Sequence, residues 1–139
     1  MPNSKQILIV SGHAEDKFTR IALEQRGFAV TAAHDLESSY GQLGNSAFDL
    51  VIIDVARAEK GIELVKRLRA TPKLSKTFVL TIADWGTGQA TLALSEGADA
   101  YEPKPISSER LVGAVERLLR QRVARPAAAT NAIGIETDA

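Results

Sequence analysis

The chain is predicted to fold as a doubly wound α/β domain with a five-stranded parallel sheet, in the strand order 2-1-3-4-5. Two observations support this fold class. Short apolar runs alternate along the sequence with longer segments whose apolar residues recur at helical spacing. Several of the short runs are apolar throughout, which is typical of strands buried on both faces of a parallel sheet. The alternation favours right-handed crossovers, with helices covering both faces.

The first half of the chain contains three expected strands. Phe18, Ile21, Ala22 and Gln25 form one stripe of the first helix, and Gly27 suits the left-handed conformation that often follows a helix end. Asp35 is a suitable cap for the second helix. The expected elements are a strand over residues 6–10, a helix over 14–26, a strand over 28–32, a helix from 35 to about 45, and a strand over 50–53 that ends at Asp54.

The second half repeats the alternation. Gly97 is placed to end the fourth helix, and Ser107 to cap the fifth. The expected elements are a helix that follows Gly61 and closes at Pro72, a strand over residues 78–82, a helix over 89–96, a strand over 98–102, and a last helix with an apolar stripe through Leu111, Val112, Val115, Leu118 and Leu119. Residues 1–122 are therefore expected to form one domain, and residues 123–139, which lack such a stripe, a disordered tail or linker.

Composition restricts the classes of partner. The 17 basic and 17 acidic side chains cancel to zero net charge, so the chain has no overall basic field for direct binding to nucleic acid. The chain has no cysteine, which suits a reducing compartment. The apolar run over residues 7–10 is too short for a signal peptide or a membrane span. The expected location is the cytoplasm, without a membrane partner.

The chemistry is expected where the carboxyl ends of the strands meet. In open parallel sheets, the ligand crevice lies outside these ends, near the point where the strand order reverses. Four strand ends would bring together residues 11–13, Asp54, residues 81–83 and Lys104.

These segments carry a family resemblance. Residues 7–10, 49–54 and 97–101, followed by Lys104-Pro105, resemble in order and spacing the landmarks of response-regulator receiver domains of the CheY-like superfamily, over residues 5–122. The resemblance implies that Asp54 accepts a phosphoryl group from a histidine kinase or phosphotransfer protein and that Lys104 contacts the phosphoryl oxygens. It also implies that Tyr101 changes rotamer on activation and that Mg²⁺ is the cofactor.

The sequence departs from the family pattern at the positions of the metal-binding acids and of the switch hydroxyl, and also after Asp54, where residues 55–61 lack the common methionine-proline pair. Ser11 and Gly12 stand where receivers usually have two adjacent acids, and neither replaces a carboxylate ligand of Mg²⁺. Glu15 and Asp16, nearby, are either substitute ligands beside Asp54 or acids that favour a helix amino terminus. The usual spacing from Lys104 places Ile82 where the family has a switch hydroxyl, and a shift of one residue would place Thr81 there.

Two hypotheses from different classes therefore remain. The first is a phosphoacceptor switch, favoured by Asp54 and Lys104. The second is a pseudo-receiver, which binds proteins without phosphorylation and is favoured by Ser11, Gly12 and Ile82. Under both, the chain is not an enzyme and its output is a downstream protein effector, with a homodimer as a further partner. A flavodoxin-like cofactor enzyme shares the architecture, but the sequence has no positive flavin signature.

Overall fold

The computed structural model describes residues 4–11 and 17–124, which form a sheet covered by helices. The strands are β1 (Gln6–Ser11), β2 (Ala29–Ala33), β3 (Leu50–Asp54), β4 (Phe78–Ala83) and β5 (Ala100–Pro103). The helices are α1 (Lys17–Glu24), α2 (Leu36–Asn45), α3 (Ala58–Ala70), the short 3-10 helix η2 (Pro72–Leu74), α4 (Thr87–Glu96) and α5 (Ser108–Ala124).

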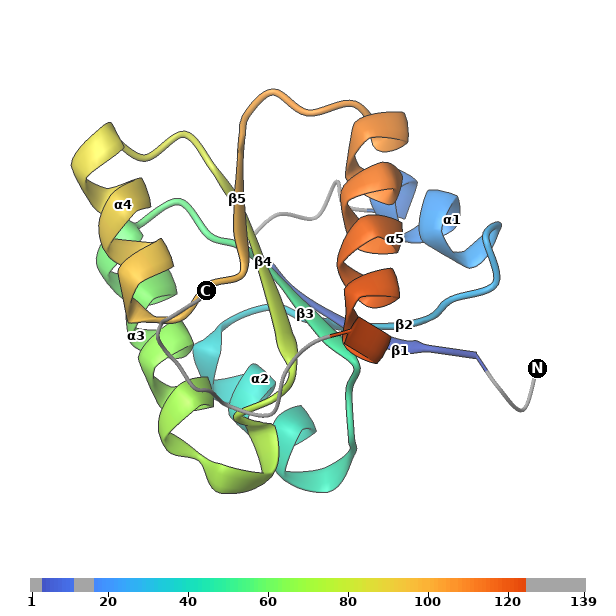
Figure 1. Cartoon of the computed structure of the whole chain (residues 1–139), viewed down its shortest axis with the longest axis horizontal. Helices are drawn as coiled ribbons and strands as arrows, with labels where there is room; N and C mark the ends of the chain where they lie inside the picture. Colours follow the sequence, from blue (N-terminus) through green and yellow to red (C-terminus); the bar gives the residue numbers. More distant parts are fainter. Residues whose placement is uncertain (1–3, 12–16, 125–139) are drawn as a thin grey trace.

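The sheet confirms the predicted topology. Its order is β2-β1-β3-β4-β5, and all neighbouring pairs are parallel. Helices α1 and α5 cover one face, and α3 and α4 lie on the other side together with α2 (Figure 1). In the register, Ser11 pairs with Asp54, and Ile53 pairs with Thr81. Because all strands run the same way, their carboxyl ends form one edge of the sheet.

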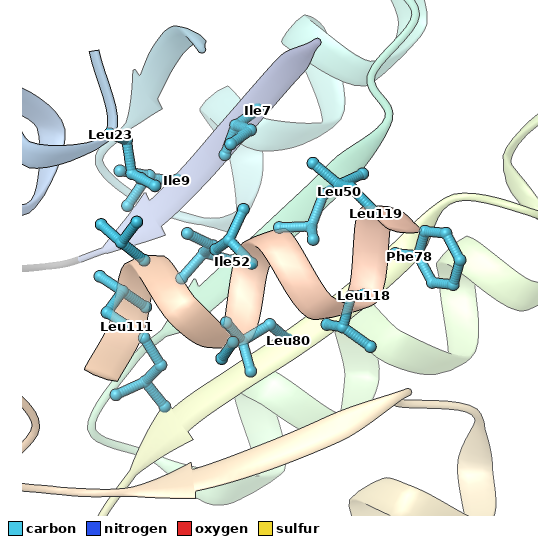
Figure 2. Packing of buried hydrophobic residues seen from close by; sticks show 14 of the residues in the cluster. Ile7, Ile9, Leu23, Leu50, Ile52, Phe78, Leu80, Leu111, Leu118 and Leu119 are labelled. Carbon is cyan, nitrogen blue, oxygen red and sulfur yellow. The ribbon is translucent and has the colours of Figure 1, made fainter. Parts of the chain in front are cut away.

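The core has two halves, one on each face of the sheet. On the first face, α5 lies across the strands, and its Leu111, Leu118 and Leu119 belong to one buried cluster with Ile52 and Leu80 (Figure 2). On the second face, Val51 and Ile53 pack with residues of α2, α3 and α4. Leu50 to Ile53 are each at most 1% exposed. This double burial explains why the strand reads as a continuous apolar run in the sequence.

The predicted helix ends are largely confirmed. Asp35 accepts a hydrogen bond from the Ser38 backbone N–H, and the Ser38 side chain completes a capping box. Ser107 accepts a hydrogen bond from the Arg110 N–H at the start of α5. Gly27 and Gly97 have positive φ angles of 91° and 130°, the conformation expected of glycine after a helix.

Two details of the helices differ from the sequence prediction. Phe18 and Ile21, which lie on the stripe predicted for the first helix, are 67% and 47% exposed, whereas Leu23, outside that stripe, is fully buried. Helix α1 is only 8 residues long and presses on the sheet through Leu23 and Ala22, so the rest of the stripe stays outside. Helix α3 begins at Ala58, before Gly61, which lies buried in its first turns.

Arg69 stabilises the edge of the sheet where β4 and β5 begin, opposite the carboxyl edge. Its guanidinium donates to the carbonyls of Gly97, Ser75 and Thr77 at 2.7–3.0 Å and pairs with Asp99 at 2.8 Å. Asp99 also accepts the Val79 N–H at 2.8 Å. These contacts fix where β5 starts, and hence where Lys104 emerges at the other end.

The burial of β3 leads to a stability prediction. Val51→Ala should lower the free energy of unfolding by about 1–3 kcal/mol, because apolar contacts are lost and a cavity remains between two packed layers. Chemical denaturation measures the change. The control, Leu92→Ala, removes a side chain that is 42% exposed and should change stability by about 0.5 kcal/mol or less. Equal effects of the two substitutions would contradict the assignment of β3 as the central buried strand.

Candidate functional site

Asp54 and Lys104 form an ion pair at the carboxyl edge of the sheet. The Lys104 Nζ lies 2.6 Å from the Asp54 Oδ1, and the two side chains are 33% and 13% exposed. Oδ1 of Asp54 makes no hydrogen bond within the described part of the chain. The contact with Lys104 is therefore a close pair of charges whose angles do not meet those of a hydrogen bond. An accessible carboxylate beside a flexible ammonium is suited to accept an electrophile whose negative charge the lysine can follow.

The strand register explains how Lys104 reaches Asp54. Ile82 pairs with Glu102 and Ala83 pairs with Pro103, so β5 continues directly to Lys104. The Lys104 N–H donates to the Ala83 carbonyl at 3.0 Å, which holds the residue at the end of β4. The following Lys104–Pro105 peptide bond is cis. From there the long side chain extends to the end of β3.

Thr81 and Ile82 lie on opposite faces of the sheet. Thr81 pairs with Ile53, which packs against α2–α4, whereas Ile82 packs in the other half of the core with Ile52. Side chains alternate along a strand, so Asp54 shares the face of Ile52 and Ile82. The structure therefore does not bring the Thr81 hydroxyl and the Asp54 carboxylate together. Thr81 is fully buried, and its Oγ1 has no hydrogen-bond partner among the described residues.

Tyr101 is held on the second face by the loop between β4 and α4. Its hydroxyl accepts the Trp85 N–H at 3.0 Å and lies 3.1 Å from the Ala83 carbonyl, to which it donates. The Trp85 indole N–H in turn donates to the carbonyl of Val55, the residue after Asp54, at 3.1 Å. Sequence reasoning missed Trp85. The signal that could have drawn attention to it is a single tryptophan placed just after a buried strand.

The proposed metal ligands are only partly described. Ser11 is 4% exposed and stands beside Asp54 in the register, on the same face. Gly12, Glu15 and Asp16 lie outside the described residues. Within residues 4–11 and 17–124, no three histidine, cysteine, aspartate or glutamate side chains gather into a group that could hold a metal ion.

These donors do not fit Mg²⁺ well. The described part of the site offers one carboxylate, and the ammonium of Lys104 already contacts it. Mg²⁺ prefers six oxygen ligands in a near-octahedral arrangement and usually needs carboxylates to offset the loss of bound water. A neutral hydroxyl at residue 11 supplies no such charge.

A pocket of about 480 Å³ opens beside the site, between the loops that follow β2 and β3. Leu36, Val55 and Ala56 give it apolar walls, and Asp35 and Lys60 lie at its lining. Hydrogen bonds from the Ser38 backbone and hydroxyl hold the pKa of Asp35 below its ordinary value. Asp35 is therefore a stable negative charge at this edge of the sheet.

Comparison with known proteins identifies the family. Residues 7–116 match the model of the response regulator receiver domain. The chain belongs to this family. It is 35% identical over 119 residues to the transcriptional regulatory protein CpxR of Escherichia coli, a match that covers 84% of this chain and 50% of CpxR. It is 30% identical over 124 residues to the transcriptional regulatory protein TrcR of Mycobacterium tuberculosis, covering 87% and 48%.

Solved structures agree on the fold. A CheY-like receiver domain from Methanospirillum hungatei superimposes with a TM-score of 0.79 at 23% identity, covering 88% of this chain and 98% of that one. Receiver domains are signalling modules of two-component systems, and the family generally binds Mg²⁺. The chain spans about half the length of the curated relatives that it matches. None of the described helices is long and apolar enough to cross a membrane.

The position of Thr81 leads to a prediction that separates its structural role from a switching role. Thr81→Val keeps the shape of the side chain and removes a buried hydroxyl that has no partner, so stability should stay equal or rise by up to about 1 kcal/mol. Denaturant unfolding measures this change. A loss of stability together with slower phosphorylation of Asp54 would show that the hydroxyl does have a partner at the site.

The missing acids lead to a metal-binding prediction. Replacing Ser11 and Gly12 together by aspartate should increase Mg²⁺ affinity by about tenfold or more, which corresponds to about 1.4 kcal/mol of added charge stabilisation. Isothermal titration measures the affinity. Adding Asp54→Asn to this variant should reverse much of the gain. Equal affinity of the wild-type chain and the double variant would contradict the prediction and point to Glu15 or Asp16 as ligands.

Proposed function

We propose that this receiver domain is a phosphoacceptor, in which Asp54 takes a phosphoryl group from the phosphohistidine of a histidine kinase or phosphotransfer protein. An Asp54 carboxylate oxygen attacks phosphorus, and the bond between phosphorus and the imidazole nitrogen breaks. The departing nitrogen keeps the electron pair, and because the other ring nitrogen of the phosphohistidine carries a proton, the ring leaves as neutral imidazole. The observation that supports this proposal most strongly is the 2.6 Å contact between Asp54 and Lys104 in a matched receiver fold.

Lys104 has two parts in this proposal. Before transfer, its ammonium lies 2.6 Å from Oδ1 of Asp54 and positions the carboxylate. After transfer, the flexible side chain follows the new negative charge onto the phosphoryl oxygens, where it offsets charge that also develops in the transition state. The described donors do not fit a metal ion, so Lys104 is the cation that faces the acceptor in this proposal.

The output is proposed to be a change in a protein-binding surface formed by α4, β5 and α5. Two apolar side chains of α4, Leu92 and Leu94, are 42% and 45% exposed, which is suited to contact with a protein partner. Tyr101 on β5 is partly exposed and hydrogen-bonded to the loop that precedes α4. Movement of Lys104 at the end of β5 would therefore act next to this surface.

A second candidate function is a pseudo-receiver that binds proteins without phosphorylation. Ile82, without a hydroxyl, occupies the face of Asp54, and Ser11 stands beside the acid in place of a carboxylate. Under this alternative, the Asp54–Lys104 ion pair is a permanent structural contact and the surface of α4, β5 and α5 has one state.

Labelling with a phosphodonor distinguishes the two functions. Wild-type chain incubated with acetyl phosphate and Mg²⁺ should gain the mass of one phosphoryl group, and Asp54→Asn should gain none. Lys104→Met should slow labelling by about 10- to 100-fold, the scale of losing one charge-stabilising donor. Glu59→Gln, which alters an exposed acid in α3, is the matched control and should label like the wild type. A folded wild-type chain that gains no mass would favour the pseudo-receiver.

A further inference from the structure

Trp85 joins the loop after β3 to the loop after β4. Its indole N–H donates to the Val55 carbonyl at 3.1 Å, one residue beyond Asp54. Val55 and Trp85 both pack against the second half of the core. A hydrogen bond to this carbonyl restrains the peptide that leaves the acceptor residue, so the backbone next to Asp54 depends on the position of the indole.

Gly61 makes room for the indole. A Cβ atom at residue 61 would overlap the Cη2 and Cζ2 atoms of Trp85, so the six-membered ring lies directly on the backbone of α3. The φ angle of Gly61 is not positive, so close approach of the ring, rather than backbone conformation, explains the glycine. The indole is therefore fixed by two contacts: its six-membered ring packs on α3 at Gly61, and its N–H donates to the Val55 carbonyl.

The backbone of Trp85 is held by Tyr101. The Tyr101 hydroxyl accepts the Trp85 N–H at 3.0 Å, and its single hydrogen is shared between the carbonyls of Ala83 and Trp85 at 3.1 and 3.3 Å. The two rings also contact, with centroids 5.9 Å apart at an angle of 53°. Tyr101 lies on β5, so any displacement of Trp85 acts directly on the α4–β5 side of the domain.

At the end of β4, no described side chain forms a hydrogen bond that would link Asp54 to the α4–β5 side of the domain. Ile82, on the face of Asp54, has no hydrogen-bonding group, and the Thr81 hydroxyl points to the opposite face. One continuous path in the described residues runs from Asp54 through the Val55 carbonyl to Trp85 and then to Tyr101.

We propose that Trp85 is the positioning residue that couples the charge state of Asp54 to the α4–β5 surface. Loss or gain of charge at Asp54 shifts Lys104 and the peptide at Val55, which changes the hydrogen bond to the indole and moves the loop that Tyr101 holds. The proposal rests on the proposed function for the claim that phosphorylation supplies the charge change. The coupling itself can be measured without phosphorylation.

Trp85 fluorescence provides the first test, because the chain has one tryptophan. Asp54→Asn should shift the emission maximum and change quenching by acrylamide, since the ion pair with Lys104 is lost. Glu24→Gln is the matched control: it also removes a carboxylate from an ion pair, with Arg20, but lies on α1, which packs on the opposite face of the sheet from Trp85. Its emission should equal that of the wild type.

Hydrogen exchange in a Trp85→Phe variant provides the second test. Phenylalanine keeps an aromatic ring over Gly61 and removes the N–H donor, so amides of residues 85–90 and 100–103 should exchange about two- to tenfold faster. In the wild-type background, Asp54→Asn should change exchange over the same residues. In the Trp85→Phe background, this response to Asp54→Asn should be lost, while β1 and β2 exchange normally.

The outcomes separate this proposal from the proposed function. Emission of Asp54→Asn identical to wild type, or a full response of residues 100–103 in the Trp85→Phe background, would overturn the coupling. The emission test uses no Trp85 variant, so poor folding of Trp85→Phe does not remove it. If acetyl phosphate does not label the wild-type chain but Asp54→Asn still changes the Trp85 emission, the phosphoacceptor proposal is refuted and the coupling is supported. Labelling that leaves Trp85 emission unchanged refutes the coupling alone.

Discussion

The structure depends on the burial of β3 on both faces. Leu50 to Ile53 are each at most 1% exposed, because α5 covers one face and α2–α4 cover the other. A polar side chain within this strand would be buried without solvent, at a cost of several kcal/mol unless it were paired. The first position open to the edge of the sheet is Asp54. β1 is buried in the same way from Ile7 onwards, and its polar residue Ser11 stands beside Asp54 at the carboxyl edge.

Within the described residues, the charge contact of Asp54 at that edge is with a lysine, Lys104. Asp54 and Lys104 neutralise each other at 2.6 Å, and Ser11 adds no charge. Attraction between two charges is stronger in such a partly buried place than in water, since the effective dielectric is lower. An anion added to Asp54 would find its counter-ion already present, whereas a divalent cation would compete with Lys104 for the same oxygen.

The two edges of the sheet are built differently. At the edge where β4 and β5 begin, Arg69 donates hydrogen bonds to three carbonyls and to Asp99, which fixes the start of β5. At the carboxyl edge, the Thr81 hydroxyl has no partner among the described residues, and the Asp54 contact has poor direction. Proteins commonly concentrate such local imperfections where they function, and stabilise the fold elsewhere.

The sequence by itself determined the element order, the sheet topology, the caps at Asp35 and Ser107 and the two left-handed glycines, because each follows from local periodicity or from the chemistry of a single residue. It also placed Asp54 and Lys104 at one edge. Only the tertiary structure decided the face of Thr81, since a shift of one residue in register moves a side chain through the sheet. The tertiary structure also decided that Phe18 is exposed and that Trp85 packs on Gly61. Packing between segments that are distant in the sequence produces no periodic pattern of residues.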